Sequence, residues 1–254
     1  MPLLPVREVV QATPRARIVR LSLAGSRFPY EPGQAVSVGL PGSQNASYSI
    51  AGAPHDAVRD DCLELLVGTE GNSREFQQAL RPAAALDVHG PIGTFKFTAG
   101  PSARRFAFIA AGTGIAPLRA MLRHALQDGR NEAMVFYSAR TPHEFAYRNE
   151  LEALARSGRI DLHLSVTRYG SAPGWQQGRG RFGREHAQAI VKRGTPVCFL
   201  CGPTSFAHET RRLLISMGVS PDQVRMDDWL MTKPSSSAAV STGLGVVSPS
   251  LASP

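Results

Sequence analysis

The stretch from residue 106 to 126 constrains the fold of this chain more than any other. An unbroken apolar run from Phe106 ends at Gly112-Thr113-Gly114, and apolar residues at helical spacing follow. This order predicts a buried parallel strand, a tight turn and a helix, with Pro117 in the first helical turn. Glycines let backbone N–H groups approach a ligand, and a helix N-terminus attracts anions, so the turn predicts a diphosphate site. Gly-x-Gly alone also occurs where glycines serve packing only.

Length and composition exclude several classes of protein. The 254 residues are 43% hydrophobic, enough for one large or two medium domains. The chain has no apolar run of membrane-spanning length and no signal-peptide pattern, which predicts a cytoplasmic protein. Three cysteines cannot build a disulfide scaffold or a four-cysteine iron–sulfur cluster, and the histidines lack zinc-type spacing, so no metal site is expected.

The basic balance of the chain does not indicate nucleic-acid binding. The net charge is +8, but only Lys96, Lys192 and Lys233 are lysines, and the arginines are scattered without a basic tract. This distribution favours separate anion sites over a DNA-binding face, and it leaves an acidic protein partner possible.

The first hundred residues predict an antiparallel β-barrel. Short strand patterns separated by Gly/Pro turns occupy 7–23, 28–40, 46–54, 62–68 and 86–97. One short helix is expected over 74–80, capped by Asn72 or Ser73, and its start beside Arg74 is a second candidate anion site.

After residue 103 strands alternate with helices, which predicts a doubly wound parallel sheet. Further strands are expected over 133–139, 160–167, 196–201 and 224–229, and helices over 143–155, 182–192 and 204–217. A glycine- and arginine-rich loop spans 169–181. We therefore expect a barrel domain at 1–99, an α/β domain at 104–232 and a disordered tail at 233–254, which carries no charge beyond Lys233.

The order of these pieces resembles the ferredoxin–NADP(H) reductase superfamily of flavoproteins, in the compact form of bacterial ferredoxin or flavodoxin reductases and oxygenase reductase components. The resemblance implies an FAD-binding barrel of Greek-key type followed by an NAD(P)-binding domain. It further implies hydride transfer from NAD(P)H to FAD, with FMN less expected, and electron transfer to ferredoxin, flavodoxin or an oxygenase component. Two alternatives are a free-flavin or oxygenase-component reductase, and a nonenzymatic nucleotide-binding regulator of the same fold.

In the first domain the resemblance rests on the family's Arg-x-Tyr-Ser motif, which here reads Ala46-Ser47-Tyr48-Ser49 and continues to Ile50. The family implies that Tyr48 packs on the flavin ring and that Ser49 bonds near its N5. The phosphate-binding arginine is replaced by Ala46, a loss for which Arg74 could compensate. Gly71, Asn72 and Ser73 match the family's phosphate-binding turn. Without the resemblance they indicate an ordinary helix cap, and Tyr48 a half-buried strand residue.

In the second domain Gly112-Thr113-Gly114 with Pro117 resembles the family's NAD(P)-diphosphate turn. Cys201-Gly202-Pro203 resembles the strand-end motif whose cysteine lies beside the nicotinamide. A redox pair of Cys198 and Cys201 is not expected, because side chains three apart on one strand point to opposite faces.

Basic residues that hold the 2′-phosphate in NADPH-using relatives are matched by Arg140, Arg168 and either Arg179 or Arg181, and Ser138 adds a hydroxyl. The resemblance thus favours NADP(H), with NAD(H) as the alternative. It also places an acidic and an aromatic residue near the flavin at the end of the domain, here Asp227 or Asp228 for proton delivery, and Trp229. The expected catalytic residues are Ser49, Cys201 and Asp227.

Overall fold

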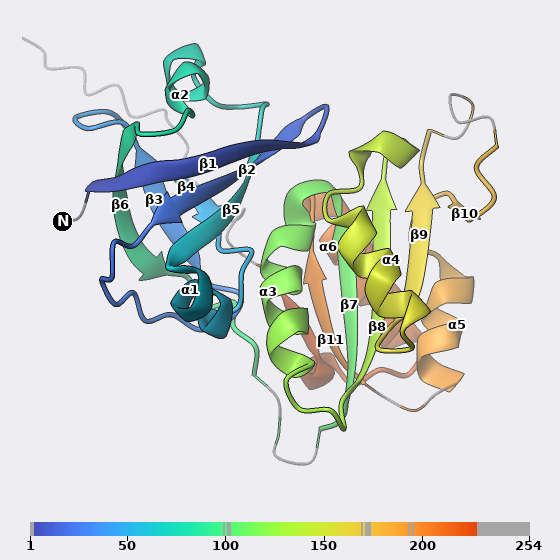
Figure 1. Cartoon of the computed structure of the whole chain (residues 1–254). Coiled ribbons are helices and arrows are strands. Elements are labelled where there is room, and N and C mark those ends of the chain that lie inside the picture. The colour runs from blue at the N-terminus through green and yellow to red at the C-terminus, as the bar shows by residue number, and fades with distance from the viewer. Residues whose placement is uncertain are drawn as a thin grey trace, which may run out of the picture.

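The computed structural model describes residues 3–98, 100, 103–168, 170, 174–192, 194 and 196–227. Within these residues the chain forms two lobes side by side, each built on a six-stranded sheet (Figure 1). All strands of the first sheet precede residue 93 and all strands of the second follow residue 104. The expected domains at 1–99 and 104–232 stay a prediction, and the tail expected over 233–254 lies outside the described residues.

The first sheet is antiparallel, in the order β4-β3-β6-β1-β2-β5. A bridge between Ile50, directly after β4, and Leu65 of β5 joins its two edges, so the sheet closes into the predicted barrel. Apolar side chains that alternate along the strands fill the interior, among them Leu21, Val36 and Leu86. The strands are β1 Leu3–Thr13, β2 Ala16–Ser22, β3 Ala35–Gly39, β4 Ala46–Ser49, β5 Cys62–Gly68 and β6 Ala85–Ile92.

Two short helices interrupt the barrel strands. The predicted one, α2 (Arg74–Ala79), begins after Ser73, whose hydroxyl accepts a hydrogen bond from the Phe76 N–H at 3.1 Å. The other, α1 (Pro54–Asp60), was not expected from the sequence. Its start is closed by Asp56, whose carboxylate accepts the Ala53 N–H at 3.0 Å.

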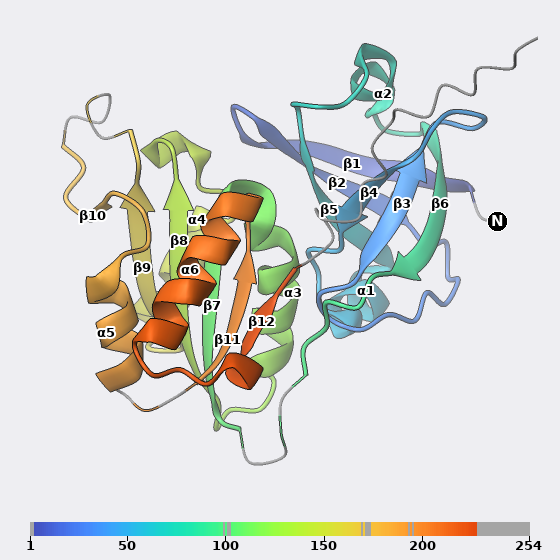
Figure 2. The same cartoon turned by 180° about the vertical axis from the view of Figure 1, so that it is seen from behind.

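The second sheet is parallel, in the order β10-β9-β8-β7-β11-β12, as predicted for a doubly wound fold. Helices α3 and α4 lie on one of its faces and α5 and α6 on the other (Figures 1 and 2). The bounds are β7 Arg105–Ala111, α3 Ile115–Ala125, β8 Glu132–Ala139, α4 Arg148–Arg156, β9 Asp161–Val166, β10 Gly178–Arg179, α5 Arg184–Lys192, β11 Val197–Cys201, α6 Thr204–Ser216 and β12 Val224–Met226.

Some expected elements differ from the structure. The strands expected over 46–54 and 86–97 end at Ser49 and Ile92. The helix predicted over 143–155 is instead a 3₁₀ turn, Pro142–Glu144, followed by α4 from Arg148. Phe145 is extended and Tyr147 is left-handed, because Phe145 and Ala146 turn inward and are buried in the core. The last strand ends at Met226, and Trp229 lies outside the described residues.

Apolar residues join the two lobes. Ala51 and Leu66 of the barrel belong to the same buried cluster as Ile115 and Leu118 of α3. Phe97, which precedes the second lobe, packs its ring on Phe199 of β11 with centroids 5.3 Å apart. Helix α3 therefore lies against the barrel, at the junction of the lobes (Figure 1). Among the residues that the structure describes, no helix has the length and apolar character needed to cross a bilayer.

Candidate active site

The predicted diphosphate turn connects β7 to α3 as a single 3₁₀ turn, Gly112–Gly114. Gly112 has a positive φ of 56° and faces open space, and Thr113 is also exposed. Gly114, the residue before α3, has no side chain that could cap the helix. The Ile115 N–H donates to the carbonyls of Gly112 and Thr113, and Pro117 has no N–H. The exposed backbone of Gly112 and Thr113, at the positive end of α3, is therefore the part of the turn that fits an anion such as a diphosphate.

The turn touches the end of β11, which carries the second predicted nucleotide motif. A Cβ added to Gly114 would lie 2.3 Å from the carbonyl oxygen of Cys201. One added to Gly202 would lie 2.9 Å from the Cβ of Ala111 and equally close to the Phe206 ring. Neither position has room for a larger residue, so glycine is required for this close approach. Pro203 follows and precedes α6.

Tyr137 of β8 binds the backbone of the diphosphate turn, a role that the sequence did not reveal. Its hydroxyl donates to the Gly112 carbonyl at 3.0 Å and accepts the Ala146 N–H at 3.2 Å. The side chain is completely buried, and burial raises the pKa of its hydroxyl. A buried tyrosine usually bonds through its hydroxyl, so a tyrosine in an otherwise apolar strand is a signal for such a contact.

The Cys201 thiol donates to the Asp227 carboxylate at 3.5 Å, and Cys201 is buried. Burial, then the charge of Asp227, raises the pKa of this thiol well above its ordinary value, so it stays protonated. Cys198 lies in the core on the other face of the sheet, where burial raises the pKa of its thiol to about 12. Both thiols are free, as predicted.

The barrel lobe brings Tyr48 of β4 to Asn72, which precedes α2. The Tyr48 hydroxyl donates to the Asn72 side-chain oxygen, and Asn72 donates to the Gly68 carbonyl at 2.6 Å. The Tyr48 ring stacks on Phe76 with centroids 5.9 Å apart and planes 6° from parallel. Burial raises the pKa of Tyr48 to about 12. Phe76 occupies one face of the ring, so a flavin would pack on the other; no sequence motif identified Phe76.

The remaining predicted flavin residues differ in exposure. Gly71 and Arg74 are exposed, as is Ala46 at the start of β4, and Ser49 is half-buried. Gly71 has a positive φ and open space around it, which suits a phosphate-binding turn. The Ile50 side chain is fully buried in the barrel core, so only its backbone can face a cofactor.

The two predicted cofactor sites adjoin across Gly68. A Cβ on Gly68, at the end of β5, would be 3.8 Å from the methyl group of Thr113, an ordinary van der Waals contact. The carbonyl of the same glycine accepts the hydrogen bond from Asn72. The flavin motif and the diphosphate turn are thus separated by one backbone segment.

The candidate 2′-phosphate residues gather at the carboxyl ends of neighbouring strands. Ser138 is buried near the end of β8, and Arg140 follows this strand. The Arg168 N–H donates to the Arg140 carbonyl at 2.8 Å. Arg179 lies in β10, beside β9, and its guanidinium donates to the Trp175 carbonyl at 3.3 Å. The other candidate, Arg181, forms an ion pair with Glu209 at 3.7 Å. These positions agree with an anion site at this edge of the sheet.

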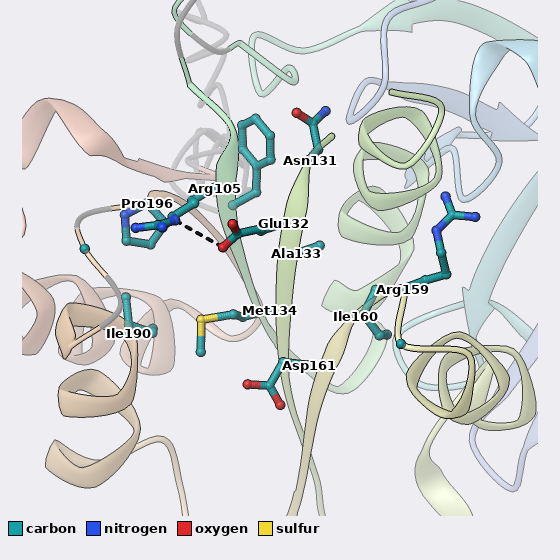
Figure 3. A pocket seen from close by; sticks show the side chains of 13 residues that line it. Arg105, Asn131, Glu132, Ala133, Met134, Arg159, Ile160, Asp161, Ile190 and Pro196 are labelled. Carbon is teal, nitrogen blue, oxygen red and sulfur yellow. Dashed lines mark hydrogen bonds and ion pairs between the residues drawn. The ribbon is translucent and has the colours of Figure 1, made fainter. Parts of the chain in front are cut away.

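A pocket of about 360 Å³ opens at the opposite end of the parallel sheet (Figure 3). Its walls include the strand starts, where Arg105 of β7 pairs with Glu132 of β8 at 3.1 Å. Ligands of open α/β sheets bind at the carboxyl ends of the strands, so we do not assign this pocket to the nucleotide. No group of side chains that could hold a metal ion occurs in the described ranges.

Comparison with known proteins identifies the family of the chain. A family model described as an oxidoreductase NAD-binding domain matches residues 108–212. Ferredoxin–NADP reductase B of Sorangium cellulosum is 36% identical over 190 residues, 70% of this chain and 76% of that protein. The reductase subunit Stc4 of a stachydrine N-demethylase from Rhizobium meliloti is 32% identical over 83% of this chain and 62% of its own length.

Solved structures show the same fold at low sequence identity. The ferredoxin reductase of a carbazole 1,9a-dioxygenase has a TM-score of 0.74 at 22% identity, over 88% of this chain and 68% of that one. The cytochrome b5 reductase domain of Ulva prolifera nitrate reductase has a TM-score of 0.74 at 21% identity, over 88% and 95%. Together with the sequence relatives, these likenesses confirm the family expected from the motifs: the chain belongs to the ferredoxin–NADP(H) reductase superfamily, oxidoreductases that bind FAD and NAD(P)H.

Proposed function

We propose that the protein is a flavin-dependent reductase that takes a hydride from NADPH and passes electrons through FAD to a protein acceptor. The observation that carries this proposal is the junction at Gly68, where the Asn72 end of the flavin motif and Thr113 of the diphosphate turn meet. When bound, the flavin supplies the hydride acceptor and releases electrons to the partner.

The chain's own task is to bind and align two flat ring systems. The exposed backbone of Gly112 and Thr113, at the positive end of α3, and the open space beside Gly112 would hold the nucleotide diphosphate. Tyr48 would present the free face of its ring to the flavin, with Asn72 fixing its hydroxyl. Ser49, next along β4, would contact the flavin near its reactive nitrogen.

Cys201 is suited to packing rather than to covalent chemistry. Its thiol stays protonated and is held by Asp227, so it cannot act as a thiolate nucleophile. We propose that the neutral sulfur lies against the nicotinamide and keeps water from the ring. Asp227 fixes the thiol proton in place.

Several features support NADPH and an acidic acceptor. Arg140, Arg168 and Arg179 lie at one edge of the sheet with Ser138, a set that suits a 2′-phosphate. The relatives include a ferredoxin–NADP reductase and the reductase subunits of an N-demethylase and of a glycine betaine monooxygenase. The net charge of +8 favours an acidic protein such as ferredoxin, flavodoxin or an oxygenase component.

The test begins with reconstitution with FAD or FMN and a visible spectrum, followed by anaerobic mixing with NADPH or NADH. We expect FAD to bind, bleaching with either nucleotide, and a higher kcat/KM for NADPH. Arg140→Gln should lower the NADPH preference by about tenfold, the scale of one charge-assisted contact. Arg130→Gln, an exposed arginine paired with Asp128, is the matched control. Failure to bind either flavin would refute the proposal.

A second function is favoured by Ala46. This exposed residue stands where the family has a phosphate-binding arginine, so flavin could bind weakly and leave as a product. A free-flavin reductase would show saturation with added FMN or FAD and no stimulation by ferredoxin or flavodoxin. Tight FAD with acceptor-dependent turnover would exclude it.

A further inference from the structure

Helix α3 connects the nucleotide turn to the barrel through two arginines. The helix begins directly after Gly114 and lies at the junction of the lobes (Figure 1). It carries Arg119 and Arg123, which are four residues apart and therefore lie on one side of the helix. The Arg119 side chain is only 10% exposed. A buried arginine on the apolar stripe of a helix needs partners, and the structure provides them from both lobes.

Arg119 reaches the strand end that carries the flavin motif. One of its terminal nitrogens donates to the Ala51 carbonyl at 2.8 Å and to Glu64 of β5 at 2.9 Å. Its Nε donates to Glu150 of α4 at 2.8 Å. Ala51 follows Ser49 by two residues, so a single side chain joins the diphosphate helix to the backbone beside Tyr48.

Arg123 makes a second connection, to α1. It binds Asp56 with two parallel hydrogen bonds of 2.6 and 2.8 Å, and it donates to Glu150 at 2.6 Å. The Asp56 side chain is 9% exposed and also caps α1 through the Ala53 N–H. Glu150, which belongs to the same lobe as the two arginines, accepts hydrogen bonds from both and so fixes the two guanidinium groups relative to each other.

The ion pairs of Arg119 and Arg123 belong to a larger, partly buried cluster of charges. Arg20 of β2 binds Glu64 at 2.8 Å and also pairs with Glu8, and Arg59 pairs with Asp56 at 3.1 Å. The cluster lies beside a cavity of about 510 Å³ at the junction. Buried ion pairs of this kind add little net stability but specify one geometry, because planar forks tolerate little displacement.

We propose that Arg119 and Arg123 are positioning residues for hydride transfer: they fix the flavin motif of the barrel relative to the diphosphate turn of the parallel-sheet lobe. This inference rests on the proposed function. The two arginines act through Ala51, Glu64 and Asp56, which set where β4 and α1 lie. A misplacement of about 1 Å between reacting groups costs on the order of 100-fold in rate, so small shifts of the lobes would be measurable.

The experiment uses the full chain reconstituted with FAD and two variants. Arg119→Lys keeps the charge but lacks the fork, and the double variant Arg119→Met/Glu64→Gln leaves no unpaired carboxylate on the barrel side. The matched control is Arg130→Met, which removes an exposed arginine paired inside one lobe. Three quantities are measured: the limiting rate of flavin reduction by NADPH in stopped flow, the Kd for NADP⁺, and the number of calorimetric unfolding transitions of the apoprotein.

We expect both variants to reduce the limiting rate at least about tenfold while the Kd for NADP⁺ stays within about twofold, since the nucleotide lobe itself is intact. The double variant should unfold in two transitions where the wild type and Arg130→Met unfold in one. An unchanged rate, or a rate and affinity that fall together, would overturn the inference. If the wild type binds no flavin, the proposed function fails, and a single transition in the double variant would then refute the positioning role as well.

Discussion

The Tyr137 hydroxyl ties the carbonyl of Gly112 to the N–H of Ala146, so one oxygen fixes both the nucleotide turn and the segment before α4. Tyr137→Phe removes this oxygen, so the Gly112 carbonyl and the Ala146 N–H each lose one hydrogen bond. We expect a loss of about 1–3 kcal/mol in the free energy of unfolding and weaker NADP⁺ binding, because the turn is no longer held. Denaturant unfolding and calorimetric titration with NADP⁺ measure the two effects.

Tyr30 provides the control for that substitution. Its hydroxyl is also buried and donates to a backbone carbonyl, that of Gly52, at 2.9 Å, but within the barrel. Tyr30→Phe should cost comparable stability and leave NADP⁺ affinity unchanged. Equal effects of both substitutions on affinity would show that Tyr137 acts only through general stability.

At the scale of elements, the approach of β11 to the start of α3 depends on Gly114. A Cβ there would meet the Cys201 carbonyl carbon and oxygen at 2.5 and 2.3 Å, and backbone atoms cannot give way as side-chain ends do. We expect Gly114→Ala to lower the free energy of unfolding by about 1–3 kcal/mol, the usual cost of overpacking, and to weaken NADP⁺ binding. Chemical denaturation and titration test this.

Gly129 is the matched position for Gly114→Ala, since it has open space around it and no positive φ. Gly129→Ala should be neutral or slightly stabilising, because it restricts only the unfolded chain. A destabilisation as large as that of Gly114→Ala would contradict the steric explanation.

Elements with strong periodicity or a recognisable turn could be predicted from the sequence. The run from Phe106 into α3 and the alternating barrel strands carried clear patterns. Helix α1 did not, because seven residues are too few for helical periodicity and its cap uses Asp56 from within the helix. Likewise, Phe145 interrupts the expected helix because its ring packs against Tyr137 and Trp175, contacts that the local sequence pattern does not reveal.

In the candidate site too, some residues could be predicted from local sequence motifs and others could not. Motif residues such as Gly112 and Tyr48 could be identified, and the structure brings their neighbourhoods together. Phe76, Tyr137 and Arg119 could not be assigned roles, because each acts through a contact between elements far apart in sequence. Arg119 had one signal: it lies four residues after Ile115 on the apolar stripe of α3.

At the scale of the whole molecule, the Asp56–Arg123 pair makes the contact between the lobes sensitive to acid. Burial alone would raise the pKa of Asp56. The hydrogen bonds from Arg123 and from the Ala53 N–H together outweigh this effect, so the pKa falls from its ordinary value of 3.8 to about 2. A carboxylate with a lowered pKa stabilises the folded state above pH 4, and this contribution is lost as the pH falls towards 2. The shift corresponds to about 2 kcal/mol.

We therefore expect the stability difference between the wild type and Asp56→Asn to shrink as the pH falls from 5 to 2, measured by urea unfolding at each pH. Glu132→Gln serves as the control, because Glu132 is exposed and its ion pair with Arg105 lies within one lobe. A difference that does not vary with pH would show that Asp56 matters through packing and not through its charge.

Because both arginines that bind the barrel lie on α3, the contact between the lobes depends on their angular position around the helix axis. Arg119 and Arg123 point to the barrel only because they follow Gly114 by five and nine residues. One inserted residue would swing them by about 100° around the helix axis. Chimaeras that graft this barrel onto another nucleotide-binding half must therefore preserve the spacing along α3 as well as the residues themselves.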